Sequence, residues 1–249
     1  MTFDRELGIL FLHHRTCEVT VEHFRLLKQW NPEAAHIPLT TSLKGLDGAF
    51  GPLNLSDFAR EQARNPGVDW NLRSAADVLV CAWYRQREIR CARWLIVEWD
   101  VWCGCSVMDY FKEVWDLPFV APSVRWRNRE PEWAWWAHLH HMPEEAWPFA
   151  AGIVPFTPLL IRDDVLSAVA AAMTSTLSGN VMCELRFPTL AYQAGFTPAA
   201  NPKSDWRITW TPHEPNTKLD ATFWHPIKWL AKQDGAGLAT CGPFTSETR

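Results

Sequence analysis

Residues 94–100, Trp-Leu-Ile-Val-Glu-Trp-Asp, decide the fold class of this chain. The stretch belongs to a strand predicted over residues 94–102, because the apolar run Trp94–Val97 is typical of a strand that is buried on both faces of a parallel sheet. Two acids, Glu98 and Asp100, end the run at positions i and i+2, so both side chains lie on the same side of an extended segment. Because ligands of open α/β sheets gather at the carboxyl ends of the strands, the stretch predicts a polar site there.

The flanking sequence extends this prediction to an α/β fold with a mostly parallel central sheet flanked by helices. Residues 8–14 (GILFLHH) read as a buried strand that ends in polar residues, and residues 36–40 read as a second short strand. Between them, Thr20 can cap a helix with an apolar stripe, so the chain begins with a βαβ unit. Further elements are predicted as strands at residues 76–83 and from Phe119, and as helices at residues 165–173 and from Pro188 to Gly195.

The remaining segments fit a single domain over residues 1–249. Residues 41–73 are rich in Gly, Pro, Asn and Asp, which indicates loops with one short helix around residues 55–64. Residues 123–149 are rich in Trp and His without a clean period, which is typical of a lid or of a segment that contacts an acceptor.

The composition favours a soluble protein with a small-molecule or glycan ligand. A formal net charge of −4 argues against nucleic-acid binding. No apolar run is long enough for a transmembrane segment and no signal peptide is apparent, while seven scattered cysteines suggest a reducing compartment, so we expect a cytoplasmic protein. The sixteen tryptophans favour a carbohydrate or nucleotide ligand, although a Trp side chain is equally a core residue.

Common phosphate-binding and nucleophile motifs are absent from the sequence. No G-x-G-x-x-G follows the first strand, and neither a P-loop nor a G-x-S-x-G elbow occurs. A hard divalent cation is the alternative holder of phosphate, and Glu98 and Asp100 supply the oxygen ligands that magnesium or manganese prefers. The two acids can equally cap a loop or pair with Arg90 or Arg93.

Several short motifs, taken in order, resemble those of a GT-A-type glycosyltransferase. They are the first strand with its polar loop, the Glu98-Trp-Asp100 motif, the apolar segment 152–159, Cys183-Glu-Leu-Arg186 before a helix, and the late Phe223-Trp-His225-Pro. The resemblance implies a nucleotide-sugar donor, a hydroxyl acceptor that can be a glycan, and a manganese or magnesium cofactor. This sequence departs from the usual GT-A motif in one respect, because the first acid of its acid-x-acid motif, Glu98, is Glu rather than the commoner Asp.

The resemblance also assigns roles to individual residues. It implies that Asp100 binds the metal directly, that Glu98 contacts the ribose or a metal-bound water, and that His225 is a further metal ligand. Lys228 would meet a phosphate oxygen, and Glu184 would contact the acceptor or remove its proton. Two alternatives remain open: His225 can pack among neighbouring tryptophans, and Glu184 can form a salt bridge with Arg186.

Other candidate residues surround the predicted nucleotide site. His13, His14 and Arg15 end the first strand, where the fold receives the nucleotide, and Asp77 is a weaker candidate for the base or ribose. The three histidines at 138, 140 and 141 lack a fourth ligand at structural-zinc spacing, so we do not predict zinc there.

The function predicted from these residues is metal-dependent transfer of a sugar from a nucleoside diphosphate. A nucleotidyltransferase or hydrolase that uses the same acids is one alternative. A carbohydrate-binding protein without turnover is the other.

Overall fold

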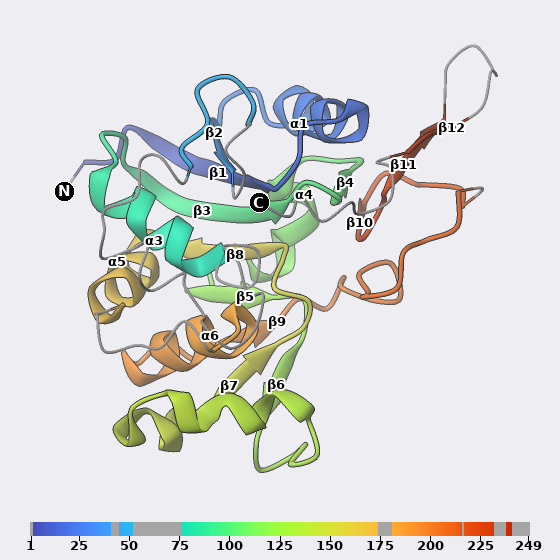
Figure 1. Ribbon diagram of the computed structural model, residues 1–249. Helices are drawn as coiled ribbons and strands as arrows, with labels where there is room; N and C mark the ends of the chain where they lie inside the picture. The colour runs from blue at the N-terminus through green and yellow to red at the C-terminus, as the bar shows by residue number, and fades with distance from the viewer. Residues whose placement is uncertain are drawn as a thin grey trace, which may run out of the picture.

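The computed structural model describes residues 2–40, 45–51, 76–173, 181–215, 217–231 and 238–240. Its centre is a six-stranded sheet in the order β2-β1-β3-β8-β5-β9 (Figure 1). The strands of this sheet are β1 (Arg5–His13), β2 (Ala35–Thr40), β3 (Cys91–Glu98), β5 (Phe119–Ala121), β8 (Leu159–Arg162) and β9 (Ala199–Ala200). The predicted helix around residues 55–64 lies outside the described residues.

The sheet is mostly parallel, as predicted. β1 pairs in parallel with β2 and with β3, and β5 pairs in parallel with β9. β8 pairs antiparallel with both β3 and β5, so β8 alone runs against the other strands of this sheet. The carboxyl ends of β1, β2, β3 and β5 therefore share one edge, to which the amino end of β8 also belongs.

Helices cover both faces of the sheet. The main ones are α1 (Glu18–Trp30), α3 (Ala76–Gln86), α4 (Val107–Phe111), α5 (Asp163–Ala172) and α6 (Cys183–Gln193). The shorter elements are β4 (Trp102–Cys103), η2 (Lys112–Val114), β6 (Val124–Trp126), η3 (Ala134–His141), η4 (Glu144–Phe149), β7 (Ala151–Ile153), β10 (Phe223–Trp224), β11 (Trp229–Ala231) and β12 (Leu238–Thr240).

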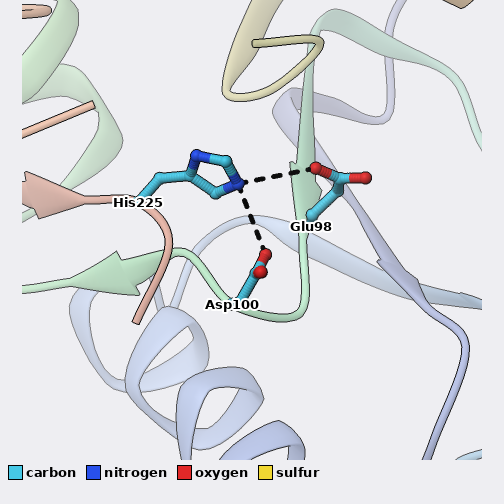
Figure 2. A group of neighbouring side chains, drawn as sticks. All are labelled: Glu98, Asp100 and His225. Atoms are coloured by element: carbon cyan, nitrogen blue, oxygen red, sulfur yellow. Dashed lines mark ion pairs between the residues drawn. The ribbon is translucent and has the colours of Figure 1, made fainter. Parts of the chain in front are cut away.

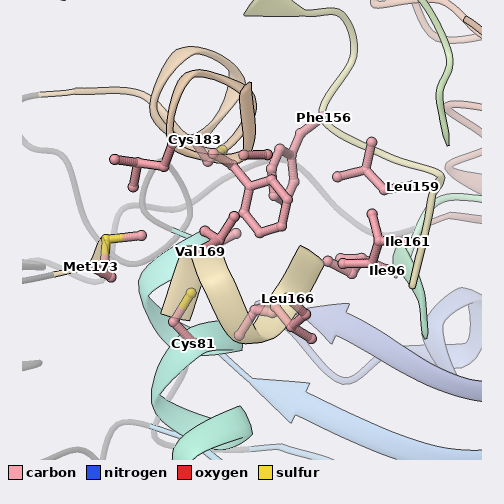
Figure 3. Packing of buried hydrophobic residues seen from close by; sticks show 14 of the residues in the cluster. Cys81, Ile96, Phe156, Leu159, Ile161, Leu166, Val169, Met173 and Cys183 are labelled. Carbon is pink, nitrogen blue, oxygen red and sulfur yellow. The ribbon is translucent and has the colours of Figure 1, made fainter. Parts of the chain in front are cut away.

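Alternate residues of the central strands feed two separate cores. Leu10 and Ile96 belong to the core under α3, α5 and α6, part of which Figure 3 shows. Their neighbours Ile9 and Leu95 belong to the core under α1 and α4. This alternation follows from the period of two in a strand, and burial on both faces explains why the strands read as unbroken apolar runs.

The closest contact between β1 and β3 requires a glycine. Gly8 pairs with the buried Trp94, and a Cβ atom at Gly8 would lie 2.2 Å from the Trp94 ring. The approach of these two strands therefore depends on a residue without a side chain, which helps to place the end of β3 beside the end of β1.

Four predictions about these elements differ from the structure. The strand predicted over residues 94–102 ends at Glu98, with Trp99 and Asp100 in a turn. Thr20 lies inside α1, whose N-cap is Cys17. Residues 76–83 form helix α3 and not a strand. Pro188 does not open a helix, because α6 begins at Cys183 and contains Pro188, which moves Glu184 into the first turn. The strands around residues 8–14, 36–40 and 94–98 and the helix after Arg162 are confirmed.

Among the described residues, no helix has the length and apolarity needed to cross a membrane. Cys17 is disulfide-bonded, which the sequence did not predict, while Cys81, Cys91, Cys103, Cys105 and Cys183 are free thiols.

Candidate metal centre

The acids Glu98 and Asp100 lie at the carboxyl edge of the sheet, as predicted. Glu98 is the last residue of β3 and pairs with Leu12 of β1. The chain then turns, with the Val101 amide donating to the Glu98 carbonyl at 3.0 Å. The turn carries Asp100 back toward Glu98, so the two carboxylates face the same space.

A short antiparallel pair brings His225 to these acids. Strand β10 pairs with β4, with Trp224 opposite Trp102, so the residue after β10 lies beside the turn that precedes β4. The Ile227 amide donates to the Asp100 carbonyl at 2.7 Å and fixes this position. His225 and Asp100, although far apart in the sequence, therefore become neighbours.

Glu98, Asp100 and His225 form a compact group of metal-ligating atoms (Figure 2). His225 Nε2 lies 3.5 Å from Asp100 Oδ1 and 3.7 Å from Glu98 Oε2, and the three ligand atoms are within 4.8 Å of one another. Ligands at about 2.1 Å from a magnesium ion lie roughly 3.0 Å apart in adjacent octahedral positions. A small inward movement of these side chains is therefore enough to surround a divalent cation.

The hydrogen bond of His225 sets its ring for ligation. A carbonyl oxygen can only accept, so the 2.9 Å contact with the Thr209 carbonyl requires that His225 Nδ1 donates its proton. Nε2 then faces the two acids, and in the neutral ring its lone pair is free to bind a metal. This orientation of a ligand histidine by an outer carbonyl is typical of metal sites.

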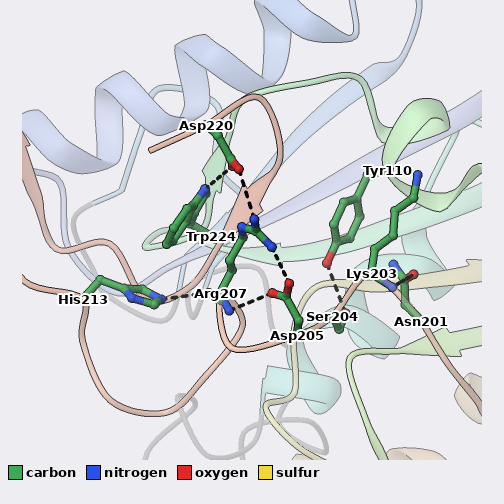
Figure 4. Close-up of polar contacts among 9 residues, drawn as sticks. All are labelled: Tyr110, Asn201, Lys203, Ser204, Asp205, Arg207, His213, Asp220 and Trp224. Carbon is green, nitrogen blue, oxygen red and sulfur yellow. Dashed lines mark hydrogen bonds and ion pairs between the residues drawn. The ribbon is translucent and has the colours of Figure 1, made fainter. Parts of the chain in front are cut away.

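The segment that supplies the Thr209 carbonyl is held by a polar network (Figure 4). Arg207 ion-pairs with Asp205 and with Asp220, the latter at 3.2 Å, and Trp224 Nε1 donates to Asp220 Oδ1 at 2.9 Å. Backbone bonds join the same segment to His225 on both sides, from the His225 amide to Arg207 and from the Thr209 amide to His225. His225 thus has little freedom to turn away from the acids.

The charges of the three residues depend on one another. Burial alone would raise the pKa of Asp100, but His225 and Lys228 hold it below its usual value. Burial, followed by the nearby Asp100 carboxylate, raises the pKa of Glu98. Burial opposes protonation of His225, yet the two carboxylates raise its pKa above the ordinary value. The two carboxylates therefore stabilise the positive charge that His225 carries when it is protonated.

Access to the group differs among its members. The side chain of Glu98 is 32% exposed, whereas those of Asp100 and His225 are each 7% exposed. Thr157 Oγ1, at the amino end of the β8 edge, donates to Glu98 Oε2 at 3.1 Å. Of the three side chains, Glu98 is therefore the one most accessible to a ligand that binds at the surface of the site.

Three more predicted residues converge on Trp99, between the two acids. The Arg15 guanidinium lies 5.5 Å and Lys228 Nζ 5.9 Å from the Trp99 ring, and the His14 ring meets it edge-on at 5.1 Å. Lys228 Nζ is also 3.5 Å from Asp100 Oδ2. One cation, Lys228, thus lies beside Asp100, and a second, Arg15, lies at the ring of the residue between the two acids.

Two of the predicted nucleotide contacts are deeply buried. His13 is 1% exposed, and burial lowers its pKa to about 4, so its ring is neutral near pH 7. Asp77 is fully buried in α3, where Arg186 of α6 donates to both of its carboxylate oxygens at 2.7 and 2.5 Å. The structure thus gives Asp77 a role in packing two helices, and its predicted contact with the nucleotide stays a prediction.

Glu184 is buried in the first turn of α6, and the described partner of Arg186 is Asp77 and not Glu184, so the predicted contact of Glu184 with an acceptor stays a prediction. Its carboxylate accepts from Cys183 Sγ at 3.1 Å and is 6% exposed. Burial raises the pKa of Glu184 to about 7, and the carboxylates of Glu98 and Asp77 add to the shift. A carboxyl group that titrates near neutral pH suits a general base.

The titration of Glu184 predicts how stability depends on pH. The folded state keeps a proton up to a pKa of about 7 that the unfolded state releases near 4.5, so the free energy of unfolding falls as pH rises across this interval. Through Glu184, the free energy of unfolding of the wild-type chain should fall by about 3 kcal/mol between pH 4.5 and 8. In Glu184→Gln we expect this part of the pH dependence to be absent. Urea unfolding at both pH values measures it, with the exposed Glu145→Gln as control. Equal pH dependence in wild type and Glu184→Gln would show that the carboxyl titrates normally.

Three groups that help to hold the site could not be recognised from the sequence. Thr157 lies between prolines in an apolar segment, and the Thr209 contribution is a backbone carbonyl that any residue supplies. His23, which is fully buried in α1, donates from Nδ1 to the Trp99 carbonyl at 2.8 Å and so fixes the peptide between the acids.

Comparison of the chain with protein-family models and with curated protein sequences gave no match.

Proposed function

We propose that this chain is a metal-dependent glycosyltransferase that moves a sugar from a nucleoside-diphosphate sugar to a hydroxyl acceptor. The observation that carries the proposal is the convergence of Glu98, Asp100 and His225 at the carboxyl edge of a mostly parallel sheet. Two acids and one oriented imidazole form a donor set that suits manganese or magnesium. The resemblance to GT-A enzymes rests on the same residues.

The residues around the triad fit a diphosphate donor. A divalent cation held by the three side chains would supply positive charge to a diphosphate leaving group. Arg15 and Lys228 both add positive charge near the Trp99 ring, where phosphate oxygens can accept hydrogen bonds from them. His14 lies at the same ring and provides a surface for the nucleoside.

Glu184 is the proposed base for the acceptor. With a pKa of about 7, its carboxylate is ionised in a large fraction of molecules at neutral pH and can take the proton of an attacking hydroxyl. Attack by that hydroxyl would form the new glycosidic bond while the bond to the diphosphate breaks, which leaves a nucleoside diphosphate as product.

A thermal-shift screen tests the proposal. UDP, GDP and CDP and their sugars are each added with and without manganese, to the wild-type chain and to Asp100→Asn. We expect at least one nucleotide to raise the melting temperature only with manganese and only in the wild-type chain, because binding to the folded state alone stabilises it.

The products distinguish the alternatives. Release of a nucleoside diphosphate from the stabilising donor supports sugar transfer, whereas release of pyrophosphate indicates a nucleotidyltransferase. If nucleotides stabilise the chain equally with and without manganese, and equally in wild type and Asp100→Asn, the proposed role of the metal is overturned. Binding of glycans without any turnover would favour a non-catalytic carbohydrate-binding protein.

A further inference from the structure

A second candidate site lies where β6 and η4, both in the Trp- and His-rich segment 123–149, meet helix α6. These elements lie together at one end of the molecule in Figure 1, where β6 pairs with β7 and α6 contacts both β7 and η4. They line an open hollow of about 460 Å³, to which Trp126, Trp147 and Tyr192 contribute. This volume is within the range of small-ligand sites, and none of the triad residues lines the hollow.

The aromatic rings of the hollow are held in place before any ligand binds. The rings of Trp126 and Tyr192 meet edge to face with centroids 5.3 Å apart, and Phe149 meets Tyr192 in the same way at 5.9 Å. Trp147 Nε1 donates to the Met142 carbonyl at 3.1 Å, while the residue stays 37% exposed. A large apolar ring that is both fixed and exposed is a binding surface that loses little conformational entropy when a ligand arrives.

Two polar side chains in the lining have unused hydrogen-bonding capacity. Within the described part of the chain, neither the Arg127 guanidinium nor the Asn128 amide makes a hydrogen bond or an ion pair, and both residues are exposed. Arg125, two residues earlier, is instead ion-paired with Glu130. The hollow therefore offers free donors from Arg127 and both a donor and an acceptor from Asn128.

From this combination we infer that the hollow binds a sugar ring of an oligosaccharide. Aromatic faces pack against the C–H groups of a pyranose, and the guanidinium and amide groups bond to its hydroxyls. Among the described residues, the lining carries one cation and no acid, so a saccharide with a carboxylate should bind more tightly than a neutral one. The role of this site as an acceptor subsite rests on the proposed function, whereas saccharide binding itself does not.

Other ligand classes fit the hollow less well. A single-stranded nucleic acid also stacks on aromatic rings, but it needs a positively charged groove along its backbone. Here Arg127 is the one cation that the described part of the chain contributes to the lining, Arg125 is paired with Glu130, and the chain carries a net charge of −4.

Isothermal titration of the full chain tests the inference with cellohexaose, chitohexaose, mannohexaose and hexagalacturonate as probes. We expect at least one hexasaccharide to bind, with hexagalacturonate the tightest, and Trp147→Ala to weaken binding at least about tenfold, or 1.4 kcal/mol. Trp210→Ala is the matched control, since Trp210 is 52% exposed and lies outside the hollow. Arg127→Ala, which removes no hydrogen bond or ion pair with the described residues, is the second variant if Trp147→Ala impairs folding. Among the four probes, it should weaken the binding of hexagalacturonate most.

The same titrations separate this inference from the proposed function. Saccharide binding should persist without manganese and in Asp100→Asn, because the triad is not part of the hollow. Failure of every hexasaccharide to bind would overturn the inference, as would equal binding by wild type and both hollow variants. Binding of an oligothymidylate in place of the saccharides would overturn it as well.

Discussion

The Asp100→Asn chain is expected to bind manganese at least about 100-fold more weakly than the wild-type chain. Changes to outer partners of metal ligands already reduce affinity about 10- to 100-fold, and Asp100 is proposed as a ligand itself. It also lies 3.5 Å from both His225 Nε2 and Lys228 Nζ, so its loss removes the negative charge around which the group is built. The decrease of the free-manganese signal in electron paramagnetic resonance measures the affinity.

Matched variants separate ligation from a general change of charge. His225→Gln should weaken manganese binding as strongly as Asp100→Asn, while Asp116→Asn removes the same charge at a highly exposed position and His140→Gln removes an exposed histidine. Both of these controls should bind like the wild type. An Asp100→Asn chain that keeps wild-type affinity would show that manganese, if it binds, is held elsewhere.

The pH dependence gives a second check on the same site. A metal and a proton compete for His225 Nε2, and the pKa of His225 is raised by the two carboxylates despite burial. Manganese affinity should therefore increase as pH rises through and above the ordinary titration range of histidine. An affinity that does not change with pH would contradict ligation by this imidazole.

The acids of this site were predictable because their signal is local. An apolar run that ends in acid-x-acid places both carboxylates at a strand end, and residues 94–100 do form the end of β3 and the turn that follows. The contact with His225 is not local. It depends on pairing between β4 and β10, two strands of two residues each, and neither has a pattern that sequence can distinguish from loop. Only the resemblance placed His225 beside the acids.

Helix α3 shows how burial removes the signal that distinguishes a helix from a strand. All residues from Ala76 to Tyr84 are buried, so the segment lacks the polar face that would reveal a period of 3.6. A short apolar run of this kind fits either element. The one charged residue in it, Asp77, was taken for a ligand contact, yet its partner Arg186 lies 109 positions later in the chain.

The ion pair between Asp77 and Arg186 predicts the largest loss of stability. Both side chains are 0% exposed, and the two hydrogen bonds between them join α3 to α6. Asp77→Ala would leave a buried guanidinium without its counter-charge, so we expect the free energy of unfolding to fall by about 3–5 kcal/mol. Urea unfolding monitored by circular dichroism measures the change.

Comparison with a half-exposed ion pair shows whether burial of the Asp77–Arg186 pair causes the loss of stability. Glu130 and Arg125 form an ion pair with side chains 32% and 36% exposed, so Glu130→Gln should cost no more than about 1 kcal/mol. A loss of unfolding free energy in Asp77→Ala as small as that of the control would contradict the structural role.

If Asp77 contacts the nucleotide instead, Asp77→Asn should weaken donor binding in a chain whose unfolding is unchanged. Because α6 also carries Glu184 in its first turn, a broken pair should disturb the position of Glu184 before it affects manganese binding at Asp100 and His225.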